Sequence, residues 1–174
     1  MELLDALRSR RSIRKFTDEP VTRDQLNALV EAGCLAPSAS NVQAWKFGIV
    51  DDADTVHKID MFSPGMSGKP TALIVACADR AYARERGGES CAAFATLDAA
   101  YACENIMLAA VDMGLGTCAI KSYNDAAVRK ILQLPEHVDI ELVIAVGHPA
   151  HDPSMPVRKP LGEVAFYNVW GKEA

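Results

Sequence analysis

The residues most able to bind an anion lie close together near the N-terminus. The stretch RSRRSIRKF, residues 8–16, has no carboxylate and five basic residues: Arg8, Arg10, Arg11, Arg14 and Lys15. Guanidinium groups form paired hydrogen bonds with phosphate oxygens, and the Ser12 hydroxyl can add another. The stretch therefore predicts a phosphate site containing Arg10, Arg11, Ser12 and Arg14. A hydrated surface cluster remains the alternative, because most basic runs are simply solvated.

Two other stretches could contribute to such a site. PSASN, residues 37–41, combines small side chains with free backbone groups directly before a predicted strand, although such a sequence also makes an ordinary turn. Arg158 and Lys159 form a second basic pair near the other end of the chain. As surface charges they would need no ligand, so neither stretch identifies a site by itself.

Two glycine motifs lack the context that their chemistry needs. Gly114, Gly116 and Ala119 match a dinucleotide-binding pattern, but a predicted helix precedes them and a strand follows. Phosphate binding requires the reverse order, with the glycines opening a helix, so these residues are interpreted as a helix end. Gly68-Lys69 resembles the end of a P-loop but lacks the first glycine and the Ser/Thr that holds magnesium.

Composition and length restrict the class of protein. The 174 residues are 49% hydrophobic and predict a single domain spanning 1–174. A formal net charge of -5 and a pI near 5.3 argue against a nucleic-acid-binding protein. No signal peptide or apolar run of roughly 18 residues is recognised, so we expect no membrane span and a cytoplasmic location.

Cysteine and histidine spacing predicts neither disulfides nor a metal site. The five cysteines lie far apart and form no C-x-x-C pair: Cys34, Cys77, Cys91, Cys103 and Cys118. We expect them to be small buried apolar residues in a reducing compartment. His148 and His151 have no third ligand at a clear spacing, so no metal is predicted.

Hydrophobic periodicity predicts a mixed α+β protein. Helices are expected near residues 3–7, 22–32, 53–60, 92–113 and 125–132. Buried strands are expected at 45–50, 71–79 and 141–149, with a strand or extended turn at 117–123 and a possible edge strand at 164–169. Residues 79–90 are expected to form a short charged connection.

The helix at 92–113 is apolar nearly all round. Phe94, Leu97, Tyr101, Leu108 and Val111 form one stripe, and the other faces are mostly alanine. A helix of this kind is buried on more than one side. We therefore expect it to be both the central core helix and a subunit interface.

Five blocks in order resemble the nitroreductase family of flavin enzymes, and the resemblance covers most of the chain. These blocks are RRSIRKF, LAPSASNVQAWKF, the alanine-rich helix with Asp98 and Glu104-Asn105, GLGTCAIKS at 114–122, and VRKPLGEVAFYN. The resemblance implies a central, mostly antiparallel sheet flanked by helices, an intertwined homodimer with the long helix at its interface, and one FMN in each of two interface clefts.

The resemblance also implies roles for individual residues. Arg10, Ser12 and Arg158 match phosphate ligands, with Arg11 and Lys159 beside them, and Arg14 matches a residue on the ribityl and pyrimidine side. The loop that the partner subunit lays against the flavin matches Pro37, Ser38, Ala39, Ser40 and Asn41. The segment that approaches flavin N5 includes Ile120 and Lys121, and many relatives have a Glu-Gly or Gly pair where this chain has Lys121-Ser122. A Lys121 cation pointing at the ring would stabilise the reduced cofactor.

The implied activity is a ping-pong transfer of hydride from NAD(P)H through FMN to a nitroaromatic, a quinone or a similar flat acceptor. Such chemistry needs no protein nucleophile, because the flavin transfers the electrons. Two alternatives stay open: a non-catalytic flavin or small-ligand binding protein on the same scaffold, and a specialised flavin enzyme such as a reductive dehalogenase. The sequence does not distinguish NADH, NADPH and ferredoxin as donors.

Overall fold

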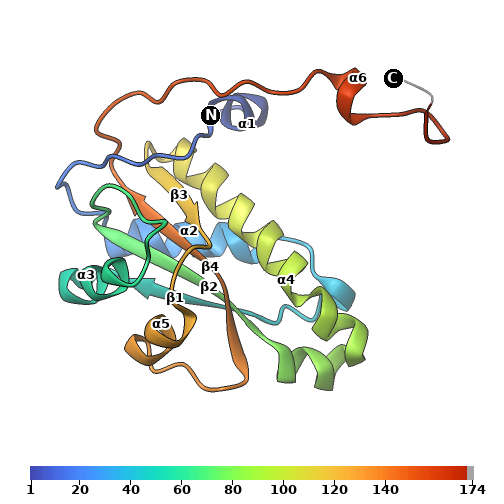
Figure 1. Ribbon diagram of the computed structural model, residues 1–174, viewed down its shortest axis with the longest axis horizontal. Helices are drawn as coiled ribbons and strands as arrows, with labels where there is room; N and C mark the ends of the chain where they lie inside the picture. The colour runs from blue at the N-terminus through green and yellow to red at the C-terminus, as the bar shows by residue number, and fades with distance from the viewer. Residues whose placement is uncertain (172–174) are drawn as a thin grey trace.

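A four-stranded antiparallel sheet forms the centre of the protein (Figure 1). The computed structural model describes residues 1–171 and orders the strands β1-β2-β4-β3. Their bounds are β1 (Trp45–Val50), β2 (Ala72–Asp79), β3 (Gly116–Ile120) and β4 (Val138–Gly147). Helices cover both faces of the sheet, which confirms the predicted α+β fold.

The central strands are buried because both faces pack against helices. In β2, Leu73, Val75 and Cys77 belong to the core on one face, whereas Ile74 and Ala76 belong to the core on the other. This alternation follows from the two-residue period of a strand. It explains why the sequence of β2 is apolar without interruption.

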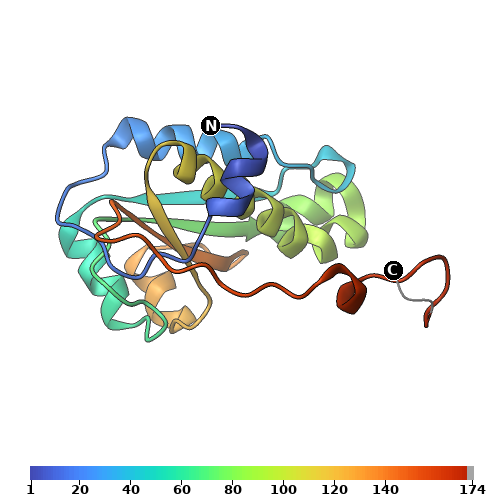
Figure 2. The same cartoon turned by 90° about the horizontal axis from the view of Figure 1, so that it is seen from above.

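Polar residues at the helix starts determine where three helices begin. α2 (Arg23–Cys34) follows a complete capping box between Thr22 and Gln25, as predicted. α3 (Ala53–Met61) is capped by Asp52, and α5 (Asp125–Ile131) by Asn124. α2 lies on one face of the sheet with α4, and α3 and α5 lie on the opposite face (Figure 2).

The longest helix, α4 (Arg80–Asp112), starts twelve residues earlier than predicted. Asp79 caps it by accepting a hydrogen bond from the Tyr82 N–H, so residues 80–90 are helical rather than a charged connection. A bend at Gly88, with φ 74° and ψ -171°, divides the helix. Only glycine adopts that backbone geometry readily, so the bend allows the first turns to take a separate direction.

The side of α4 that packs against the domain is rich in small residues, and the stripe of large residues predicted for this helix is only partly buried. Ala95, Ala99 and Ala102 are buried against the domain, whereas Phe94, Leu97 and Tyr101 are about half exposed. Small side chains let α2 and the sheet approach the helix closely, as at Gly33, where an added Cβ would lie 2.9 Å from Ile106 Cγ1. Within residues 1–171 only α4 has the length and composition of a membrane span, and this packing makes it a core helix.

Both ends of the chain lie outside the three layers. α1 (Leu3–Ser9) packs against α4, and residues 150–171 form an extended arm that leaves the body of the molecule (Figures 1 and 2). The arm contains the short helix α6 (Leu161–Val164), and the edge strand predicted at 164–169 is wrong. Residues 164–169 contain no proline, but no sheet strand within residues 1–171 lies beside them to pair with.

Four of the five cysteines are buried, and Cys34, at the C-terminus of α2, is exposed. The prediction of buried apolar cysteines is therefore wrong for Cys34. Burial raises the pKa of the Cys77 thiol to about 11 and that of Cys103 to about 12, so both are neutral packing residues. All five thiols are free, in agreement with the prediction of no disulfides.

Candidate functional site

The basic segment near the N-terminus and the beginning of the C-terminal arm enclose a cleft of about 620 Å³. None of the residues lining it is acidic, and five are cationic: Arg10, Arg11, Arg14, Lys15 and Arg158. Ser12 lines the same cleft. The structure thus brings together basic residues from the two ends of the chain, as the phosphate-site prediction requires.

Strand β3 holds the basic segment in place. Ser12 forms a parallel bridge with Thr117, and the Ile13 N–H donates a 2.8 Å hydrogen bond to the Thr117 carbonyl oxygen. Gly116 makes this approach possible, because a Cβ there would lie 2.8 Å from the Cβ of Ile13. The backbone on either side of Ser12 is therefore fixed, and the polar side chains project into the cleft.

Arg10 and Arg11 have different environments. The Arg10 Nε lies 2.9 Å from Oε1 of Glu104 on α4. The Arg11 side chain is buried, and its guanidinium donates to the Arg10 carbonyl oxygen and contacts Sδ of Met155 on the arm. The Arg11 Nε has no hydrogen-bond partner within residues 1–171. A buried donor without a partner is costly, so an anion that accepts from it would be stabilised.

The chemistry of the cleft fits the phosphate of FMN. Several guanidinium groups, one unpartnered donor and no acidic lining residue favour a ligand with two negative charges. The Ser12 hydroxyl supplies a further donor, and its side chain also lies near the Cys118 thiol. Burial raises the pKa of Cys118, which remains a packing residue under the cleft.

The PSASN loop lies outside this cleft in the same chain. Its centre forms the 3-10 turn η1 (Ala39–Asn41), which contacts α4, and no residue of 37–41 lines the cleft. The Asp98 carboxylate on α4 accepts the Ala39 N–H at 3.1 Å from both oxygens. Ser40 and Asn41 have positive φ angles of 50° and 54°, a left-handed geometry that few residues other than glycine adopt.

Asp98 and Glu104 place the two predicted binding segments on different sides of α4. Glu104 follows Asp98 by six positions, so their side chains leave the helix about 120° apart and about 9 Å apart along its axis. Burial raises the pKa of the Asp98 carboxyl, and the Ala39 N–H partly opposes that shift. The PSASN loop and the basic segment do not meet within one chain.

Ile120 and Lys121 also lie apart from the lining of the cleft. The Ile120 side chain is buried in the core, and the Lys121 Nζ donates to the Glu141 carbonyl oxygen at 2.8 Å and the Ile140 carbonyl oxygen at 3.3 Å. The register of β2 and β4 shifts at this point, leaving Glu141 unpaired with β2. The Lys121 side chain is thus held against β4, and the Lys121 carbonyl oxygen accepts the Tyr123 N–H at 3.2 Å.

Several residues of the cleft had no sequence signal. Ser67, from the loop between α3 and β2, lines it with His151 and Ser154 from the arm. Tertiary packing brings these residues to the cleft, and their residue types alone do not predict that position. Lys159, next to Arg158, is exposed and does not line the cleft. No group of three or more metal-ligating side chains occurs within residues 1–171.

The match to known proteins agrees with this geometry. A model of the nitroreductase family matches residues 7–63 and 60–148. The chain belongs to the nitroreductase family. It is therefore an oxidoreductase of a family that the order of its sequence blocks had already indicated.

Relatives within the family match over most of their length. A protein from Methanothermobacter thermautotrophicus, whose name gives NADH dehydrogenase and NAD(P)H nitroreductase as alternatives, is 31% identical over 88% of this chain and 80% of its own. A Bacillus subtilis protein named FMN reductase (NADPH) is 31% identical over 96% of this chain and 74% of its own. A nitroreductase structure from B. subtilis superposes with a TM-score of 0.87 at 29% identity, covering 97% of this chain and 75% of that one.

Proposed function

We propose that this member of the nitroreductase family binds FMN and passes hydride from NAD(P)H to nitroaromatics, quinones or similar flat acceptors. The observation that carries the proposal is the convergence of Arg10, Arg11, Arg14 and Arg158 on one cleft without an acidic lining residue. The relative named FMN reductase (NADPH) supports the same cofactor and donor class. When bound, FMN would supply the hydride chemistry, which explains why no protein nucleophile is needed.

The residues of the cleft then have distinct roles. Arg10, Arg11, Ser12 and Arg158 hold the phosphate, and Lys159 adds positive charge from outside the lining. Arg14, farther along the same segment, holds the ribityl and pyrimidine side. Ile120 and Lys121 contribute backbone groups near the reacting edge of the ring. Held by these residues, the cofactor would leave space above its ring, where the donor binds first and the acceptor afterwards.

We further propose that the active unit is a homodimer in which the PSASN loop of one subunit completes the cleft of the other. Support comes from the separation of the loop and the basic segment on different sides of α4. Because one chain does not bring the two segments together, a second copy is the simplest source of the missing half. The residues that would reach the cleft of the other subunit are Pro37, Ser38, Ala39, Ser40 and Asn41.

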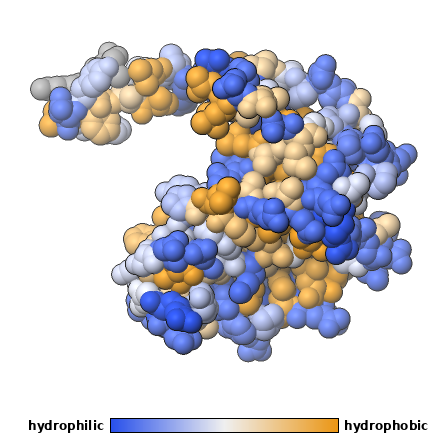
Figure 3. Space-filling view, turned by 180° about the vertical axis from the view of Figure 1, so that it is seen from behind, coloured by the Kyte–Doolittle hydropathy of each residue, from blue (hydrophilic) through white to orange (hydrophobic). Residues whose placement is uncertain are grey.

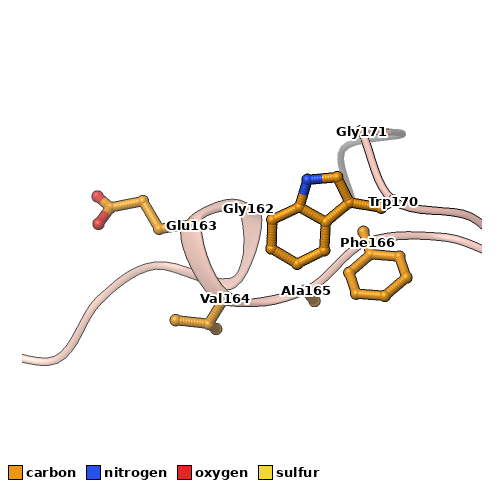
Figure 4. Close-up of a pocket in the computed structure, with 7 residues that line it drawn as sticks. All are labelled: Gly162, Glu163, Val164, Ala165, Phe166, Trp170 and Gly171. Atoms are coloured by element: carbon orange, nitrogen blue, oxygen red, sulfur yellow. The ribbon is translucent and has the colours of Figure 1, made fainter.

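The exposed apolar surface supports such a dimer. Phe94, Leu97 and Tyr101 are exposed on α4, and hydrophobic residues are visible on the body and along the arm above a hollow (Figure 3). In the arm, Phe166 and Trp170 meet edge to face with ring centroids 5.2 Å apart around a pocket of about 250 Å³ (Figure 4). Trp170 remains 87% exposed. A surface of this composition is typical of a protein interface.

The cofactor proposal is tested by the visible spectrum of the purified protein. We expect a yellow protein, or a colourless one that takes up added FMN with quenching of its fluorescence. A protein that stays colourless and leaves FMN fluorescence unchanged would reject the proposal.

Anaerobic stopped-flow reduction separates the enzyme from a non-catalytic flavin-binding protein. We expect the bound flavin to be bleached by NADH or NADPH and to recover its colour when a quinone or nitroaromatic is added. A flavin that stays oxidised with both nicotinamides would indicate a binding protein or a ferredoxin-dependent enzyme, which reduced ferredoxin would distinguish. The five free thiols suit the reducing cytoplasm, where we place this single-domain protein.

A further inference from the structure

The loop between α3 and β2 is fastened at both ends to segments near the proposed cofactor cleft. At one end the Gly65 N–H donates a 3.1 Å hydrogen bond to the Ser122 carbonyl oxygen, and the Asn124 N–H donates to the Phe62 carbonyl oxygen at 2.8 Å. At the other end Gly68 lies against Arg14. The loop therefore bridges the end of β3 and the basic segment.

Buried residues keep this loop from moving as a free surface turn. The Met66 side chain is buried in the core cluster under the sheet, and its N–H donates a 2.8 Å hydrogen bond to the Ser63 carbonyl oxygen. The Ser63 hydroxyl is itself buried and donates to the Ile59 carbonyl oxygen at 2.8 Å. Contacts with the core, through Met66 and Ser63, therefore fix the position of the loop.

Gly68 touches Arg14 at backbone level. A Cβ added at Gly68 would lie 2.4 Å from the Arg14 carbonyl oxygen and 2.9 Å from its carbonyl carbon. Gly68 also has a φ of +80°, which side-chain-bearing residues rarely adopt. Because the obstructing atoms are backbone, the basic segment itself would have to shift to accommodate a side chain. Ser67, the preceding residue, lines the cleft with Arg14.

We propose that Gly68 is a positioning residue: its contact with the Arg14 backbone determines the position of the Arg14 side chain in the cofactor cleft. The inference rests on the proposed function, because it assigns Arg14 to FMN. Arg14 is exposed and lies outside the core clusters on both faces of the sheet, so its backbone depends on the segments that touch it. β3 fixes the segment at Ser12 and Ile13, and Gly68 is the contact that follows at Arg14.

The test measures FMN affinity of the full-length protein by fluorescence quenching, with Gly68→Ala compared with Gly114→Ala. Gly114 has a similar φ of +70° but no atom within 4 Å of an added Cβ, so its variant introduces the backbone strain without the collision. We expect Gly68→Ala to raise the Kd about ten- to a hundredfold, the effect of losing a charge-assisted hydrogen bond. Gly114→Ala should lower the melting temperature but change the Kd less than about twofold.

A double-mutant cycle distinguishes positioning from general damage to the fold. In an Arg14→Ala background, Gly68→Ala should raise the Kd less than about twofold, because the group that it displaces is already gone. If Gly68→Ala weakens FMN binding equally in both backgrounds, Gly68 does not act through Arg14 and the inference is overturned.

A second variant covers the case in which Gly68→Ala does not fold. Gly68→Asn keeps the colliding Cβ, but asparagine tolerates positive φ better than alanine, so the fold is less strained. It should weaken FMN binding as strongly as Gly68→Ala. A wild-type protein that binds FMN together with a Gly68→Asn variant that binds it equally well would overturn this inference alone. A wild-type protein that takes up no FMN would reject the proposed function and, with it, the role of Gly68.

Discussion

Arg10 has two anionic partners: the Glu104 carboxylate of the same chain and the proposed phosphate of FMN. Its Nε lies 2.9 Å from Glu104, and the same side chain lines the cleft assigned to phosphate. Both side chains of the ion pair are partly exposed, 25% for Arg10 and 40% for Glu104. A pair this accessible to water is weak, so a phosphate with two charges can compete for the guanidinium.

Replacing Arg10 tests its proposed part in phosphate binding. Arg10→Ala should weaken FMN binding by about 1.5 to 3 kcal/mol, the loss of one charge-assisted hydrogen bond. The binding of riboflavin, which has no phosphate, should change little and serves as the control. Equal losses for FMN and riboflavin, measured by fluorescence quenching, would remove Arg10 from the phosphate site.

Replacing Glu104 tests the competition directly. Glu104→Gln removes the carboxylate charge beside Arg10 and should strengthen FMN binding by up to about fivefold, since exposed ion pairs contribute about 0.2 to 1 kcal/mol. Titration of the variant with FMN at low salt measures the effect, and high salt should reduce it. Weaker binding by Glu104→Gln would mean instead that the carboxylate orients Arg10 for its ligand.

Asp98 predicts a pH dependence of stability. Its pKa is raised by burial, so the folded protein binds this proton more tightly than the unfolded chain does. The stabilisation is complete below the unfolded pKa and is lost as pH rises through the raised folded value. Asp98→Asn keeps an acceptor for the Ala39 N–H but does not titrate.

We therefore expect the free energy of unfolding of Asp98→Asn, relative to wild type, to increase as pH rises from about 3 to 7. Urea denaturation across that range measures the difference. A difference that is constant with pH would show that Asp98 titrates alike in the folded and unfolded states.

At the scale of elements, α4 has opposite sides of different character. Its alanine side allows α2 and the sheet to pack closely, and Phe94, Leu97 and Tyr101 face outward, whereas Ile106 is buried. A purely hydrophobic pattern does not tell which side of such a helix meets its own domain, because alanine and leucine count alike as apolar. Side-chain size decides, since the distance between packed helices depends on the residues at the contact.

The start of α2 can be tested separately from the site. Thr22→Ala removes the side-chain acceptor of a capping box whose members are Thr22 and Gln25. We expect a loss of about 1 kcal/mol in the free energy of unfolding, measured by urea denaturation. FMN affinity should be unchanged, because Thr22 does not line the cleft. An unchanged unfolding free energy would mean that tertiary packing alone determines where α2 begins.

At the scale of the whole molecule, the proposed dimer makes assembly a condition of cofactor binding. Sedimentation of the wild type should give about twice the chain mass of 18.8 kDa. Leu97→Arg places a charge on the exposed side of α4 and should favour the monomer, because burying an unpaired charge is costly. The same variant should bind FMN weakly, since the PSASN loop of a second copy would be absent.

Glu136→Arg is the matched control for Leu97→Arg. Glu136 is exposed on the connection between α5 and β4 and belongs neither to α4 nor to the cleft lining. This variant should remain a dimer and bind FMN as the wild type does. A Leu97→Arg protein that remains dimeric with full FMN affinity would contradict the proposed interface.

Local sequence patterns determined most of the elements. The Thr22 capping box, the unbroken apolar run of β2 and the glycine after α4 act over a few residues, so their structural consequences were correctly predicted. The early start of α4 was missed because its charged first turns have no apolar stripe, although Asp79 is a suitable cap. The arm was misjudged because Val164–Val169 has strand propensity without a neighbouring strand within residues 1–171.

The sequence by itself determined the family and the types of residue available for a phosphate site, because both depend on local blocks in order. Only the tertiary structure brought Arg158 and Ser67 into one cleft lining with the basic segment. It also directed the Lys121 side chain to β4 and kept the PSASN loop away from the cleft of its own chain. Contacts between segments far apart in the chain depend on packing around the whole sheet, which no short stretch of sequence encodes.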